Sequence, residues 1–271
     1  MRGLLVALLI ATPALMLPGV QSDSSQFTVL IALLAAFLTF VEYNSNFPSI
    51  IEFREAPPFN RLRFAALFAM VFLLSAIASH HTNPNALSGG ITSVGTILGN
   101  LMDFPYSPVR LAVLMLPSDA APEMIAAMRV SAALSHLVFL VAVVLFLLCV
   151  RFLNWPTRHG AFNVWVNLPL FDPTAGRDVL YRLQRDARIN ITMGFLLPFV
   201  IPALYKLFTM IAAPVSLTNP QTLIWILSAW AFLPTSMIMR GVAMGKVASL
   251  ISEKRRRAYA DAEADGGLQT A

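Results

Sequence analysis

Two ionisable side chains lie inside long apolar stretches of the sequence. His136 falls within residues 130–150 and Lys206 within residues 191–213. An ionisable group inside a bilayer is costly, so it usually marks a functional site or a polar pair. Counted at 1.5 Å per helical residue, both lie about 10 Å below the outer surface. The sequence suggests a polar pocket open to the outside, with His136 as proton carrier and Lys206 as anion contact, and Tyr205 and Trp230 beside them.

Prolines in the last two apolar stretches support this pocket. Pro198 and Pro202 lie one turn apart, and Pro234 interrupts the last stretch. Proline frees a backbone carbonyl, and such carbonyls line sites in broken-helix transporters. The alternative is structural: Lys206 snorkels outward, and His136 bonds the carbonyl of a neighbouring helix. The two interpretations differ in whether His136 and Lys206 face each other.

Familiar catalytic and ligand-binding motifs are missing from the sequence. It contains no GxxxxGK[ST], HExxH or GxSxG pattern, and its acidic residues all lie outside the apolar stretches. Cys149 is the single cysteine, so no cysteine-built metal site can form. The sequence therefore indicates neither a cofactor nor a metal, and it favours a non-enzymatic protein.

The composition indicates a membrane protein. Hydrophobic residues make up 57% of the 271 residues and charged residues 12%, against about 45–50% and about 25% in soluble domains. A bilayer core of about 30 Å requires about 20 mostly apolar residues per helix. We expect an all-α polytopic integral membrane helix bundle in residues 1–253, followed by a basic and then disordered tail in residues 254–271. About six transmembrane helices are predicted, near residues 4–20, 25–42, 62–80, 128–152, 191–213 and 222–244.

The basic residues are distributed on one side of this bundle. Of the 19 Lys and Arg residues, 16 fall in alternate gaps between the apolar stretches. Because such residues are retained in the cytoplasm during insertion, both termini are predicted to be cytoplasmic, in a bacterial inner membrane. The pI of 9.8 then reflects an anionic lipid surface as the partner and not nucleic acid. The predicted lipid contacts are Arg182, Arg185, Arg188, Arg255 and Arg256.

The N-terminus has two interpretations. Residues 1–22 are either the first membrane span or a cleaved signal peptide, because Arg2, a short apolar run and small residues near Val20 suit both. The orientation of the other five spans is the same in either case.

The outer segment of residues 80–129 is semi-apolar. Ile91, Val94, Leu98 and Leu101 form a helical stripe, and Gly95 and Gly99 form a small-xxx-small pair. A second apolar run occupies residues 109–116. Both runs are too short to span a bilayer, so we expect interfacial or re-entrant helices on the outer side. A further helix is predicted to begin near Pro122.

The two long inner loops are rich in aromatic and charged residues. Residues 42–63 are expected to dock against the second inner loop, residues 154–190, with a partner subunit as the alternative. In that second loop Asp178 is spaced for a helical ion pair with Arg182. Trp155 and Trp165 suit the lipid headgroup region.

Together these features favour a non-catalytic accessory, assembly or scaffold component of a membrane complex, with a membrane-protein partner. The alternative is a small secondary transporter or channel-like protein that uses the pocket of His136 and Lys206.

Fusions to alkaline phosphatase test the predicted orientation, because this enzyme is active only outside the cytoplasm. A fusion after Asn100 should be active and one after Arg188 inactive. The reverse pattern of activities would overturn the orientation.

Overall fold

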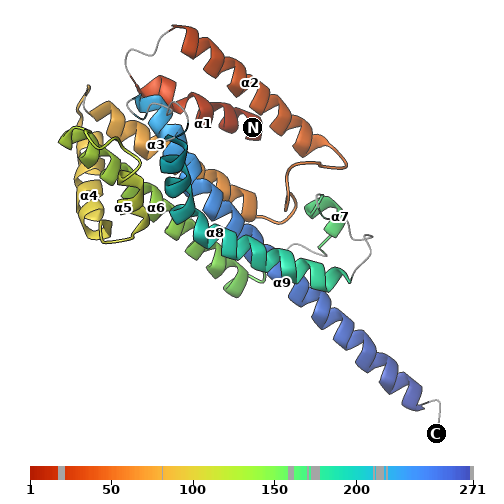
Figure 1. Ribbon diagram of the computed structural model, residues 1–271. Coiled ribbons are helices and arrows are strands. Elements are labelled where there is room, and N and C mark those ends of the chain that lie inside the picture. Colours follow the sequence, from red (N-terminus) through yellow and green to blue (C-terminus); the bar gives the residue numbers. More distant parts are fainter. Residues whose placement is uncertain are drawn as a thin grey trace.

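The computed structural model describes residues 1–17, 22–80, 82–157, 162–169, 171, 178–209, 211, 217 and 219–268. These residues form helices and no strands (Figure 1). The helices are α1 (Arg2–Met16), α2 (Ser22–Asn44), α3 (Phe59–His80), α4 (Ala86–Met102), α5 (Pro108–Val113), α6 (Pro122–Phe152), α7 (Val164–Asn167), α8 (Val179–Thr209) and α9 (Pro220–Leu268).

Five helices are long and apolar enough to cross a membrane, which confirms the predicted helical membrane bundle. They are α2, α3, α6, α8 and α9. The first predicted span, near residues 4–20, corresponds to α1, which has 15 residues and is about 22 Å long, shorter than the bilayer core of about 30 Å. The described residues therefore contain five helices of membrane-spanning length and one shorter apolar helix, and not the six equivalent spans that the sequence predicted.

The short helix α1 is packed into the bundle. It contacts α2, α3 and α9. Leu9 is 4% exposed and belongs to the main hydrophobic core. A Cβ atom on Gly3 would lie 2.6 Å from the carbonyl oxygen of Ala36, so the backbones of α1 and α2 nearly touch. Helix α1 is therefore an integral part of the packed bundle.

Helices α3, α6 and α9 form the centre of the molecule. They contact one another, and their buried side chains supply most of the main core. Helix α2 mainly contacts α1, and α8 mainly contacts α9. The outward faces of α2 and α8 are therefore open to lipid or to a partner.

The most extensive interface between two helices joins α8 to α9, and their backbones are in close contact there. A Cβ atom on Gly194 would lie 2.9 Å from the carbonyl oxygen of Pro234, and one on Gly241 would lie 2.7 Å from that of Ala187. Small residues permit such close approach between membrane helices. The buried face of α8 consists of Leu183, Ala187, Asn190, Gly194, Pro198 and Pro202.

Helix α4 forms where the sequence predicted a helix, and Ile91 and Leu98 of the predicted stripe pack against the main core. Gly95 and Gly99 face α6, where added Cβ atoms would meet the side chains of Val130 and Arg129. Val94 and Leu101 of the predicted stripe are exposed. The two glycines allow a closer approach than the larger side chains would, so they define the contact. Helix α6 begins at Pro122, as predicted.

The described part of the C-terminal tail belongs to helix α9. Helix α9 continues without interruption to Leu268 and extends away from the bundle (Figure 1). Residues 254–264 are rich in Arg and Ala, which are good helix formers. Extension of an existing helix needs no new nucleus, so these residues continue the helix that the membrane segment begins.

The contact between α8 and α9 predicts opposite effects for two neighbouring glycines. Gly241→Ala should destabilise the protein by about 1–3 kcal/mol through overpacking. Gly245→Ala should be neutral or stabilising, because its Cβ atom would have its nearest neighbour, the Cβ of Ala187, at 3.8 Å, and alanine favours helix. Thermal unfolding in one detergent measures both. Equal melting temperatures for the two variants would contradict this packing.

Candidate functional site

The richest polar network lies at the end of the bundle that carries Arg2, Arg54 and Arg240, here called the basic end. Arg240 of α9 donates two hydrogen bonds to the carboxylate of Glu52, at 2.6 and 2.8 Å. Glu52 is 7% exposed. Arg63 of α3 donates to the hydroxyl of Ser236 at 3.1 Å. The loop between α2 and α3 is thereby tied to α9 by a bidentate, charge-assisted pair.

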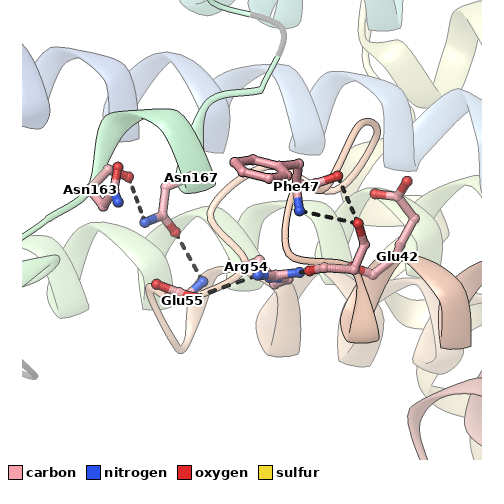
Figure 2. A network of polar contacts seen from close by, with 7 residues as sticks. Glu42, Phe47, Arg54, Glu55, Asn163 and Asn167 are labelled. Carbon is pink, nitrogen blue, oxygen red and sulfur yellow. Dashed lines mark hydrogen bonds and ion pairs between the residues drawn. The ribbon is translucent and has the colours of Figure 1, made fainter.

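Glu42, near the end of α2, orders the first part of that loop. Its carboxylate accepts hydrogen bonds from the backbone N–H groups of Ser49, Ile50 and Ile51, and from the Ser49 hydroxyl at 2.6 Å. Arg54 donates to the carbonyl oxygens of Glu42 and Ser45, at 2.9 and 2.5 Å. Figure 2 shows Arg54 reaching back toward Glu42. The loop is therefore folded back on the helix that precedes it.

The loops of residues 42–63 and 154–190 dock against each other at the basic end, as the sequence predicted. Asn167 of α7 accepts hydrogen bonds from the backbone N–H of Phe53 at 2.7 Å, through its carbonyl oxygen, and of Glu55 at 2.9 Å, through its side chain (Figure 2). The indole N–H of Trp155 donates to the carbonyl oxygen of Ala56 at 3.0 Å. These bonds join segments about 100 residues apart.

An aromatic cluster fills the space between these loops. The ring of Phe53 lies 4.6 Å from that of Phe59 and 5.6 Å from that of Trp155, and Trp155 stands edge-on to Phe146. Trp155 is 2% exposed, so its predicted place in the headgroup region is wrong: its hydrogen bond and ring contacts favour burial. The side chain of Trp165 lies outside the described residues.

The five predicted lipid-contact arginines lie on α8 and α9 at the basic end. Arg185 pairs with Asp186, Arg182 lies over the ring of Phe171, and Arg188 donates weakly to the Gln184 carbonyl. Arg256 is exposed on α9. Their contact with lipid stays a prediction.

The ion pair predicted between Asp178 and Arg182 is not the one that forms. Asp178 pairs instead with Arg255 at 2.9 Å, and this bond lowers the pKa of the Asp178 carboxyl. Asp178 precedes the first residue of α8, and its carboxylate accepts from the backbone N–H of Leu180. With the Asp178 carboxylate oriented in this way, Arg255 on the neighbouring helix α9 is close enough to pair with it.

The predicted membrane pocket is assembled only in part. The His136 ring lies 6.1 Å from that of Trp230 and 5.1 Å from that of Phe139. The Trp230 indole N–H donates to the carbonyl oxygen of Pro198 at 3.1 Å. Pro202 has no N–H to bond that carbonyl within α8. The carbonyl that proline frees is thus satisfied by Trp230.

Lys206 lies elsewhere, on a groove between α8 and α5. Its amine donates to the carbonyl oxygen of Leu116 at 3.3 Å, beside Pro117 and Ile125. Tyr205 packs against the main core. The structure therefore brings His136 and Trp230 together, while the Lys206 amine bonds the Leu116 carbonyl in the groove beside α5.

Sequence reasoning missed three acidic residues that organise the ends of the bundle. Glu52 and Glu42 act at the basic end, and Asp103, at the other end, pairs with both Arg110 and Arg129. Glu52 lies 188 residues from Arg240, so no spacing could have indicated their pairing. The described residues contain no group of three His, Cys, Asp or Glu side chains that could hold a metal ion.

The pair of Glu52 with Arg240 predicts a large difference between two neighbouring acids. Glu52→Gln should cost about 3 kcal/mol, because it leaves the charge of Arg240 partly buried without its counter-ion. Glu55→Gln should cost little, because the Glu55 side chain is 56% exposed. Thermal unfolding, with limited proteolysis of the loop after α2, compares them. Similar behaviour of the two variants would argue against the pair as a structural tie.

No family model, curated protein or solved structure matches this chain. The function is therefore inferred from the contacts and charges above.

Proposed function

We propose that this protein is a non-catalytic scaffold or accessory component of a membrane complex in the bacterial cytoplasmic membrane. In this proposal the basic end and both termini face the cytoplasm. The observation that carries it is the length of α9, which extends beyond the rest of the bundle as an exposed helical arm (Figure 1).

Helix α9 is much longer than a membrane span. Its 49 residues correspond to about 74 Å, against a bilayer core of about 30 Å. The last fully buried residues on α9 are Val247 and Ala248. From Ser252 to Glu263 every residue is exposed. About three turns of helix are therefore exposed, and Arg255 near their start is tied to Asp178, just before α8.

The arm has the chemistry of a protein-binding helix next to a membrane. Lys254 and Arg255–Arg257 lie nearest the bundle, where they can also contact anionic headgroups, and Asp261 and Glu263 follow. Tyr259 between these groups is 70% exposed. Tyrosine is enriched at the centres of protein interfaces, and charges on both sides of it can set the register of a partner.

The docked loops support a scaffold as well. Hydrogen bonds of Glu42, Glu52, Asn167 and Trp155 tie the loop between α2 and α3 to α2, to α7, to the segment after α6 and to α9. Such a network holds the base of the arm in one orientation. The transporter alternative draws less support, because the Lys206 amine bonds the Leu116 carbonyl and His136 packs against Phe139 and Trp230.

The proposal predicts a partner that touches the arm. A photo-crosslinking amino acid at position 259 should give one reproducible protein adduct in cells, whereas the same group at position 181 should not. Tyr181 is the matched control, since it is 48% exposed on α8 at the same end. Mass spectrometry identifies the adduct, and a chain ending at Ser252 should fail to recover that protein in mild detergent.

Two results would contradict the proposal. One is the absence of an adduct specific to position 259. The other is recovery of the same partner by the full and the shortened chain at equal yield, with both inserted at equal levels.

A further inference from the structure

Two adjoining cavities lie at the basic end, between the starts of α1 and α3, the end of α2 and the loop that follows it. Their volumes are about 370 and 400 Å³, within the range of small-ligand sites. Both are lined by Arg2, Tyr43, Asn60 and Arg61. They therefore form one continuous site, here called the Arg2–Arg61 cleft.

The cleft is strongly cationic. Four arginines line it, and the single carboxylate on its wall, Glu55, pairs with Arg54 at 3.5 Å. Arg63 is held by Ser236. Arg2 lies over the Tyr43 ring at 4.0 Å, and neither Arg2 nor Arg61 forms an ion pair with any residue that the structure describes. Two exposed guanidinium groups are thus available to an anion.

The walls become apolar one helical turn deeper in the bundle. On α1, Leu5 and Val6 follow Arg2, and on α3, Phe64 follows Arg61. On α2, which runs the opposite way, Thr39 lies one turn inside Tyr43. One turn is about 5.4 Å along each helix. Helices α1 and α3 therefore share the same order of charged mouth and apolar interior, and α2 contributes the uncharged side chains of Tyr43 and Thr39.

We propose that the Arg2–Arg61 cleft binds an anionic phospholipid. The phosphate group lies between the guanidinium groups of Arg2 and Arg61, which can each donate paired hydrogen bonds to it. An acyl chain follows Leu5, Val6 and Phe64 toward the membrane interior. The unpaired charge and the apolar wall match the two parts of such a lipid, and a water-soluble anion would use the charge alone.

This site differs from general attraction between a basic surface and anionic lipid. The bases on α8 and α9 form an open surface, and several of them are already paired with Asp178 or Asp186. In the cleft, two unpaired arginines from different helices converge on a concave space. Binding there should be saturable and should depend on those two residues.

Native mass spectrometry of the full chain from nanodiscs tests the proposal. The discs contain phosphatidylcholine with a minor fraction of phosphatidylglycerol of the same acyl chains. The parent protein should retain one phosphatidylglycerol in preference to phosphatidylcholine. Arg2→Gln with Arg61→Gln should weaken this retention at least tenfold, because the loss of even one charge-assisted contact amounts to about that factor. The control pair, Arg185→Gln with Arg188→Gln, removes the same charge from the same end and should retain the lipid.

Each outcome decides the matter. Equal loss of lipid in both pairs of variants would mean general charge attraction, and unchanged retention in the cleft variants would place the lipid elsewhere; either overturns the site. Displacement of the lipid by inorganic phosphate at matched concentration would overturn the lipid as its ligand. Melting temperatures of the single variants Arg2→Gln and Arg61→Gln, without added lipid, show that the fold is intact where retention is lost.

Discussion

Polar groups at membrane depth must find partners within the protein, and this constraint explains much of the structure. Hydroxyl groups inside the helices return to the backbone, as in Thr12, Ser75 and Thr235, each of which donates to a carbonyl four residues earlier. The carbonyl of Pro198, which proline chemistry deprives of its helical donor, receives the indole N–H of Trp230. This bond joins α8 to α9 beside Pro198 and Pro202, where the α8 backbone lacks a helical hydrogen bond.

At the basic end the same constraint acts on charges. Glu42 and Glu52 would be costly if buried alone, yet each is surrounded by donors from the loop between them or from α9. Satisfying these carboxylates folds the loop, and the folded loop places Phe53 and Ala56 against Trp155 and Asn167. The aromatic cluster is thus a consequence of the ionic contacts as well as of its own burial.

Local features of this fold could be predicted from the sequence, and distant pairings could not. The spans, the helix start at Pro122 and the glycine pair of α4 follow from composition and spacing within one turn or one segment. The partner of Asp178 depends on which neighbouring helix reaches it, and the pair of Glu52 with Arg240 joins opposite halves of the chain. For Lys206, the depth in the bilayer could be predicted from the sequence, but the direction of the side chain could not. The groove that it lines exists only because α5 packs beside α8.

The arginines of the basic end fall into two groups, those with an acidic partner and those without one. The first group stabilises the fold, and the second is available to bind a ligand. Arg240 and Arg54 are held by Glu52, Glu55 and backbone carbonyls, so their charge is neutralised within the fold. Arg2 and Arg61 border a concave space with an apolar wall and have no acidic partner among the described residues. A sequence that needed only a positive anchor could place these charges anywhere along the surface. Their convergence from two helices, beside a groove that an acyl chain can follow, is the arrangement that selects an anionic lipid by both of its parts.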